Sequence, residues 1–169
     1  IDLVAGLRFD ATALAALRAL AEFPEDFLDW LARFRFSGEI DAVAEGTPVF
    51  AEEPLIELTA PIAEAQLVET LVMNQVGLQT LLASKALRVV AAAAGRTVVD
   101  FGGRRAQGVE AAVAGARAFH IAGVAATSIV LAGARHGIPV VGTMAHSFVQ
   151  AFASEAEAFR AYASLYPET

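Results

Sequence analysis

The first part of the chain places apolar residues at helical spacing. Leu14, Leu17 and Leu20 recur every three residues after Asp10, so we predict a helix that Asp10 caps. A second helix is predicted with Pro24 in its first turn, where proline is favoured, and the two acidic residues that follow lie beside the positive end of the helix dipole. Its apolar stripe is rich in aromatic residues, and stripes of this kind usually form core rather than ligand sites. The stripe consists of Phe27, Trp30, Leu31 and Phe34.

The pattern changes between residues 36 and 59. Glycine and proline interrupt short apolar runs there, which is typical of a small antiparallel sheet with turns. From Pro61 to about Ala94 one long helical pattern follows, apolar around most of its circumference. Such a helix is either buried between layers or covered by a subunit interface. We expect residues 1–94 to form a mixed α+β domain with a long connecting helix.

Beyond Gly95, short apolar runs alternate with alanine-rich helical stretches. The predicted strands are 97–101, 123–125 and 140–142. A helix that ends near Arg135 meets Gly137 at its C-cap, and a last helix begins at a capping box of Ser154 and Glu157. Repeated strand–helix units with short loops imply parallel strands. The fold class expected for residues 95–169 is therefore α/β. Because three such units do not close a barrel, we expect a fragment of a longer protein.

Composition narrows the function classes. The chain has 169 residues and a formal net charge of −7, which does not suit a general nucleic-acid binder. It contains no cysteine, so disulfides and thiolate metal sites are excluded. We see no signal peptide, no membrane span and no His/Asp/Glu cluster at metal-ligand spacing. We expect a cytoplasmic protein without a protein-held metal and without nucleic-acid or membrane partners.

Polar residues follow each of the three predicted strands. These strand-end segments are Phe101–Arg105, Ala126–Ser128 and Thr143–Ser147. The carboxyl ends of parallel strands share one face, so we expect arginines, hydroxyls and one histidine to converge there. Guanidinium and hydroxyl groups together favour recognition of a carboxylate, a phosphate, or both. The residues alone do not name a reaction.

Three motifs resemble the nicotinate phosphoribosyltransferase family in order and spacing. They are DFGGRRAQG at 100–108, ATSIVLAG at 126–133 and GIPVVGTMAHSF at 137–148, and FRFSGEIDAVAEGTPVF at 34–50 is also similar. The resemblance implies synthesis of nicotinate mononucleotide and pyrophosphate from nicotinate and phosphoribosyl pyrophosphate in NAD salvage. It implies ATP as co-substrate, Mg²⁺ brought with the nucleotide or pyrophosphate, and a homodimer.

This chain is expected to contain only part of the family fold. The resemblance implies an irregular (β/α) barrel, of which residues 95–169 supply the first strand–helix units, joined to a mixed α+β second domain. The loops that bind the phosphates of phosphoribosyl pyrophosphate are expected outside this chain. We therefore expect the isolated chain to be inactive.

The resemblance also assigns roles to single residues. His146 matches the histidine that ATP phosphorylates, Arg104 matches an arginine that holds the product's phosphate, and Phe101 matches an aromatic that stacks on the pyridine ring. Arg105 either binds an anion or braces a carboxylate such as Asp100. The remaining substrate-binding candidates are Thr127, Ser128, Thr143 and Ser147. For the first two, helix capping is an alternative interpretation.

Two positions depart from the family pattern. Ile129 stands where Asn is expected and where nicotinamide-using relatives carry an acidic residue that selects the amide. Gly103 stands where a larger residue is common. Because isoleucine offers neither donor nor acceptor, nicotinamide use stays an alternative. A second alternative is a truncated, non-catalytic oligomerisation fragment, motivated by the apolar helix and the absent barrel strands.

Overall fold

A computed structural model describes residues 1–168 as two compact units. The first unit spans Ile1–Ser84, and the second begins at Lys85. This division falls inside a long helix, α4. The elements of the first unit are α1 (Asp2–Ala5), α2 (Ala11–Ala19), α3 (Glu25–Arg33), β1 (Glu39–Ala42), β2 (Ile56–Thr59) and the first part of α4 (Ile62–Ala92).

Helices α2 and α3 begin where the sequence predicts. The Asp10 side chain accepts a hydrogen bond from the Ala13 backbone N–H at 2.8 Å, which confirms the predicted cap. Pro24 is the N-cap residue of α3 rather than its first helical residue. An ion pair of 2.7 Å between Arg18 and Glu25 connects the two helices.

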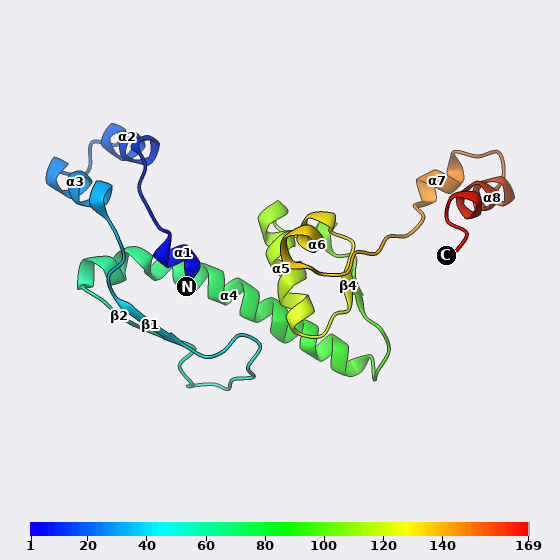
Figure 1. Ribbon diagram of the computed structural model, residues 1–169, viewed down its shortest axis with the longest axis horizontal. Coiled ribbons are helices and arrows are strands. Elements are labelled where there is room, and N and C mark those ends of the chain that lie inside the picture. Colours follow the sequence, from blue (N-terminus) through cyan, green and yellow to red (C-terminus); the bar gives the residue numbers. More distant parts are fainter. Residues whose placement is uncertain (169) are drawn as a thin grey trace. The chain divides into compact units, whose positions relative to one another are not determined.

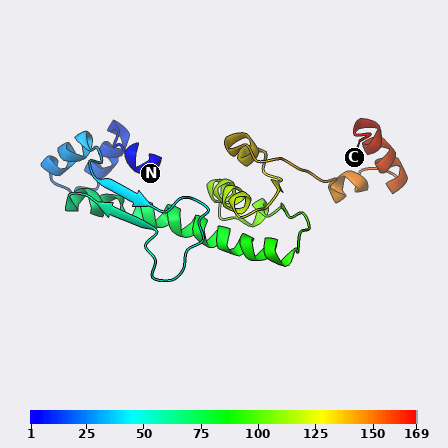
Figure 2. The same cartoon turned by 60° about the horizontal axis from the view of Figure 1, so that its bottom comes forward.

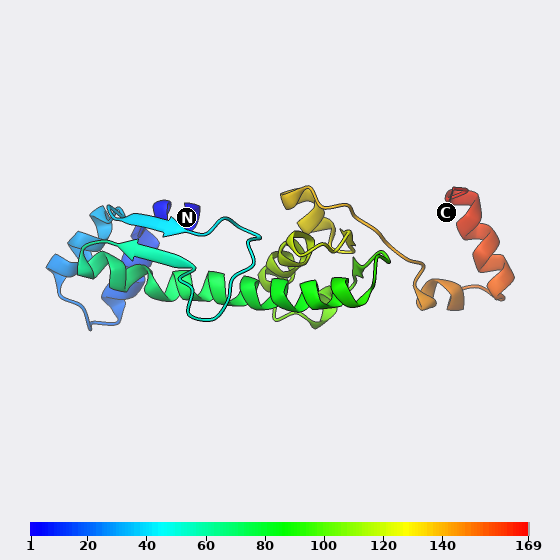
Figure 3. The ribbon, with the colours of Figure 1, turned by 90° about the horizontal axis from the view of Figure 1, so that it is seen from below.

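The core of the first unit forms between a hairpin and α4. Strands β1 and β2 pair antiparallel, with Glu39 opposite Thr59, which confirms the predicted sheet. The hairpin runs alongside the first half of α4 (Figure 3). Phe34 and Val68 are buried at the centre of this core, and Trp30 of the predicted aromatic stripe packs against them. The stripe is therefore a core element, as predicted.

Helix α4 confirms the long helical pattern, with 31 residues from Ile62 to Ala92. Several of its large apolar side chains are exposed in this chain, namely Ile62, Met73, Leu81, Leu87 and Val89. Within residues 1–168, no helix has the length and apolar character needed to cross a membrane.

The second unit contains the predicted parallel strands in shortened form. Its elements are β3 (Val99–Asp100), the 3₁₀ helix η1 (Gly103–Arg105), α5 (Val109–Ile121), β4 (Ala126–Thr127), α6 (Val130–His136), α7 (His146–Gln150) and α8 (Glu155–Leu165). β3 and β4 pair in parallel, and Val140 adds a parallel bridge to Thr127. Figures 1 and 2 show α5 and α6 beside these short strands. The α/β class is thus confirmed, while the barrel stays an expectation.

Two of the predicted strands differ from the observed ones. The strand predicted at 123–125 lies at Ala126–Thr127, because the turn after α5 extends through Gly123. The strand predicted at 140–142 is a single bridge at Val140. Pro139 lacks an N–H group, so the segment contributes the Pro139 carbonyl and the Val141 N–H to Thr127 and pairs no further.

Helices α5 and α6 of the second unit pack together through small and branched apolar residues. Ala116 of α5 and Ala132 of α6 are buried together with Val113 and Ile138, and Ile129 packs against this cluster. Gly137 ends α6 in the left-handed conformation, with φ 67°, as its predicted C-cap position requires.

The final segment contains one helix that the sequence did not predict. α7 begins at His146, and its Phe148 ring contacts Tyr162 of α8 with ring centroids 6.1 Å apart. The Ser154 side chain accepts a hydrogen bond from the Glu157 N–H, which confirms the predicted start of α8.

Candidate functional site

A pocket of about 610 Å³ opens between the loops that follow β3 and β4. This volume is in the range that small-molecule ligands occupy. Phe101, Gly103 and Arg104 line it from the first loop, and Ser128 and Ile129 line it from the second. The pocket therefore lies at the carboxyl ends of two parallel strands, where the sequence places its candidate chemistry.

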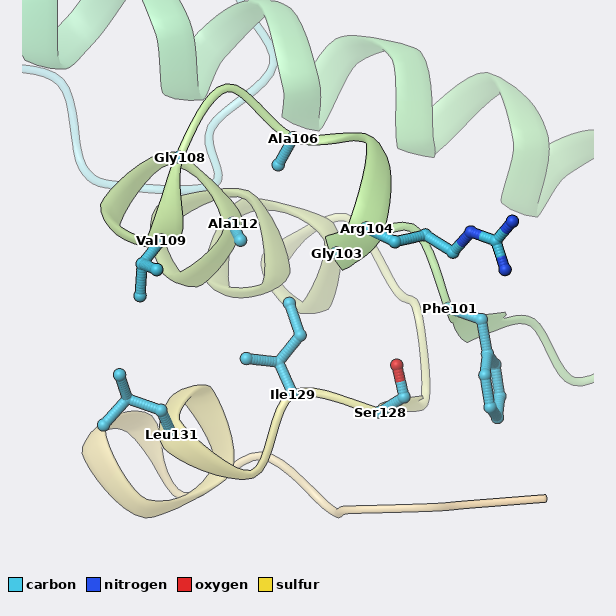
Figure 4. Close-up of a pocket in the computed structure, with 10 residues that line it drawn as sticks. All are labelled: Phe101, Gly103, Arg104, Ala106, Gly108, Val109, Ala112, Ser128, Ile129 and Leu131. Carbon is cyan, nitrogen blue, oxygen red and sulfur yellow. The ribbon is translucent and has the colours of Figure 1, made fainter. Parts of the chain in front are cut away.

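The two ends of this pocket differ in chemistry (Figure 4). At one end lie Phe101, the Arg104 side chain and the Ser128 hydroxyl. At the other end lie Ile129 and aliphatic side chains from the end of η1 and from the first turns of α5 and α6. These aliphatic residues are Ala106, Val109, Ala112 and Leu131. Such a site can take a flat ligand that carries an anionic group at one end and an apolar edge at the other.

A buried hydrogen-bonded pair joins the two loops beneath the pocket. The Thr127 hydroxyl donates to Asp100 Oδ2 at 2.8 Å, and Asp100 Oδ1 accepts the Gly102 N–H at 2.8 Å. The exposed fraction is 9% for Asp100 and 1% for Thr127. Buried carboxylates and hydroxyls are stable when they are hydrogen-bonded to each other in this way. We call these two residues the Asp100–Thr127 clamp.

The clamp also fixes the backbone of the second loop. The Ser128 N–H donates to the Asp100 carbonyl at 2.8 Å, and the Ile129 N–H donates to Thr127 Oγ1 at 3.1 Å. Because these bonds fix the backbone at residues 128 and 129, they set where the Ser128 and Ile129 side chains enter the pocket.

The structure brings three of the predicted site residues together. Phe101, Arg104 and Ser128 line the pocket, and Phe101 as a residue is 43% exposed, which leaves its side chain accessible to a ligand. Thr127 is buried rather than at the rim, and its hydroxyl is engaged by the clamp. This geometry therefore does not favour a direct contact between the Thr127 side chain and a substrate.

Besides Thr127, four predicted residues do not line the pocket. Arg105 is exposed at the end of η1, and the partners of Asp100 are Thr127 and Gly102 rather than this arginine. Thr143 lies in the exposed segment before α7, and His146 and Ser147 form the first turn of that helix. The structure therefore does not place the imidazole among the pocket's lining residues.

Sequence reasoning missed the aliphatic end of the pocket. Val109 and Leu131 are exposed apolar residues in the first turns of helices that directly follow strand-end loops. That position on the chain is the signal that could have identified them, because first-turn side chains of such helices face the same rim as the loops. Among residues 1–168, no three His, Cys, Asp or Glu side chains lie together as a protein-held metal ion would need.

Comparison with known proteins identifies the family. Residues 1–77 match the model of the nicotinate phosphoribosyltransferase N-terminal domain. Over all 169 residues the chain is 57% identical to "Nicotinate phosphoribosyltransferase pncB2" of Mycobacterium tuberculosis. The chain belongs to the nicotinate phosphoribosyltransferase family. It covers 36% of that relative's length, and so spans about a third of the protein it matches.

Other members of the family show the same partial coverage. The chain is 40% identical over 168 residues to the nicotinate phosphoribosyltransferase of Bacillus subtilis, covering 34% of it. The crystal structure of human nicotinic acid phosphoribosyltransferase matches 89% of this chain with a TM-score of 0.80 and 28% identity. That match covers 31% of the human chain. Most of this chain thus shares its fold with that human protein.

Proposed function

We propose that this chain forms part of an ATP-dependent nicotinate phosphoribosyltransferase of NAD salvage that acts in the cytoplasm. The enzyme would join nicotinate to phosphoribosyl pyrophosphate, forming nicotinate mononucleotide and releasing pyrophosphate. The observation that carries this proposal is the 57% identity over the whole chain to a protein of that name. The pocket at the strand ends supplies independent support, because its lining suits a flat aromatic anion.

Each end of the pocket has a role in this reaction. Phe101 offers an exposed ring on which the pyridine ring would stack. Arg104 supplies a guanidinium for the phosphate of the mononucleotide, and Ser128 a hydroxyl for the carboxylate of nicotinate. Arg105, beside Arg104 on η1, and Thr143 and Ser147 would contribute further anion contacts. The Asp100–Thr127 clamp would hold the two loops at the spacing the ring requires.

His146 is the proposed phosphoryl acceptor. An imidazole nitrogen would attack the γ-phosphorus of ATP, the bond to the β-phosphate oxygen would break, and ADP would leave. Later attack of water on phosphohistidine would return free imidazole and inorganic phosphate. The histidine is exposed at the start of α7, as a group that meets ATP must be. Mg²⁺ would arrive bound to nucleotide or pyrophosphate, since the described residues form no cage for it.

Replacing His146 tests this role. In the full-length protein, His146→Ala should lose the stimulation of the rate by ATP and should retain no acid-labile label from γ-labelled ATP. His136→Ala is the matched control, because His136 is also exposed but lies at the end of α6, outside the motif. Labelling of the His146→Ala protein at the wild-type level would refute the phosphohistidine role. Rates with nicotinate and nicotinamide on the same sample distinguish the acid from the amide as substrate.

We also propose that the full-length protein is a homodimer. The exposed apolar residues of α4 motivate this proposal, since a 31-residue helix with so much accessible aliphatic surface is usually covered in the assembled protein.

A further inference from the structure

Gly103 and Ile129 meet at the pocket although they lie on different loops. A β-carbon added to Gly103 would lie 3.1 Å from both Cγ1 and Cδ1 of Ile129. Both residues line the pocket, and the Ile129 side chain points toward the turn that carries Gly103 (Figure 4). The space that a larger residue 103 would fill is therefore already occupied by Ile129.

Ile129 is half-buried and is held in place on the side of the core. Its side chain packs against the core cluster that includes Val113 and Ala132, and its N–H is bonded to Thr127 Oγ1. Close-packed side chains of this kind yield to an added methyl group only with strain. Gly103 is not among the glycines with positive φ, so alanine there is conformationally allowed and its effect would be steric.

The part of the pocket that Gly103 and Ile129 line can select a ligand only by its shape. Isoleucine has a hydrocarbon side chain and glycine has none, so neither side chain offers a hydrogen-bond donor or acceptor. A polar substituent of the ligand in contact with them would lose its hydrogen bonds to water. We propose that Gly103 and Ile129 together form a size gauge that restricts the pocket to pyridine rings without a substituent on the facing edge. This inference rests on the proposed function, because it assigns a ring specificity to the same pocket.

The test measures kcat/KM of the full-length protein for nicotinate and for a panel of nicotinates, each with one methyl group on a different ring carbon. Ile129→Val removes only Cδ1 and should raise the ratio of at least one methylnicotinate to nicotinate about tenfold. Gly103→Ala should lower kcat/KM for nicotinate about tenfold and exclude the methylated substrates. The double variant Gly103→Ala/Ile129→Val should recover part of the loss, because valine lacks the Cδ1 atom that the added β-carbon would meet and keeps the Cγ1 atom.

Leu131→Ala provides the matched control. Leu131 lines the same pocket but has no atom within 4 Å of the β-carbon position of Gly103. Its effect should therefore add to that of Gly103→Ala without recovery. Strictly additive effects of Gly103→Ala and Ile129→Val, or an unchanged substrate ratio, would overturn the gauge.

Measurements of ligand binding distinguish a failure of the size gauge from a failure of the proposed function. If the wild-type protein turned over no nicotinate, the proposed function would fail, and dissociation constants of the same panel measured by calorimetry would then decide the gauge. Discrimination of methylnicotinates that follows residues 103 and 129 would support it. Equal binding of all ligands, or no binding of any, would overturn it.

Discussion

At the scale of single residues, the chemistry of the pocket depends on groups that do not themselves line it. Asp100 and Thr127 lie beneath the pocket, and four hydrogen bonds from or to them hold the loops that present Phe101 and Ser128. Loss of one partner from such a network lowers the stability of the fold, mainly because burying a polar group without a hydrogen bond costs free energy. The clamp is therefore where a small chemical change should alter substrate binding.

Thr127→Val tests the clamp because valine keeps the volume of threonine and removes its hydroxyl. The Asp100 carboxylate would lose a buried donor and the Ile129 N–H its acceptor, so we expect the free energy of unfolding to fall by about 1–3 kcal/mol. In the full-length protein we also expect the KM for nicotinate to rise while kcat falls less, since the chemistry of His146 is untouched. Thr127→Ser keeps the hydroxyl and should restore most of the wild-type KM.

The control for stability alone is Ser37→Ala in the first unit. Ser37 also makes a long-range hydrogen bond, from its hydroxyl to Glu64 Oε1 at 2.9 Å, but this bond is exposed whereas that of Thr127 is buried. Its loss should reduce stability and leave the KM for nicotinate unchanged. A wild-type KM in the Thr127→Val protein would show that the clamp is merely structural.

Three of the predicted residues line the pocket, while the arrangement around them was harder to predict from the sequence. Phe101, Arg104 and Ser128 follow strands, and the parallel pairing of β3 with β4 brings them together, as predicted. Thr127 was harder to place, because a threonine at a strand end can face the rim or the core, and only its hydrogen bond to Asp100 decides the matter. The Gly103–Ile129 contact depends on side-chain packing, which spacing along the chain does not encode.

At the scale of elements, helices were predictable and strands only approximately so. Asp10, Ser154 and Gly137 mark their helix ends through local hydrogen bonds and backbone conformation, which a short stretch of sequence determines. Strand limits depend instead on pairing with distant segments, and β4 accordingly lies beyond the predicted stretch. Helix α7 was not predicted, because it has only five residues and these are too few to show a helical period of apolar positions.

The end of α6 offers a test of this local control. Gly137 has φ 67° and its N–H donates to the Gly133 carbonyl at 2.9 Å, so alanine there would adopt a strained left-handed conformation. We expect Gly137→Ala to destabilise the end of α6 by about 1 kcal/mol, which corresponds to roughly fivefold faster local opening. Hydrogen exchange of peptides that cover α6 in the full-length protein measures this opening.

Gly142→Ala is the matched control for the backbone effect. Neither glycine has a heavy atom within 4 Å of its β-carbon position, and only Gly137 has positive φ. Exchange over α6 should therefore be unchanged in Gly142→Ala. Equal exchange in both variants would show that the left-handed C-cap contributes nothing to the end of this helix.

At the scale of the whole molecule, the surface of α4 is what the proposed homodimer must explain. Leu81 lies in the middle of this helix and is 68% exposed in the chain described here. A charged side chain at a covered apolar position loses its hydration without gaining a partner.

Leu81→Glu should therefore lower the fraction of dimer, or raise the dimer dissociation constant at least tenfold, in sedimentation equilibrium of the full-length protein. Phe50→Glu is the control, because Phe50 is 77% exposed but belongs to the loop between β1 and β2 and not to the helix. A monomeric wild-type protein, or equal weakening of the dimer by both substitutions, would contradict an interface on α4. A monomer that keeps full activity would further show that no residue of a second subunit is needed to complete the pocket.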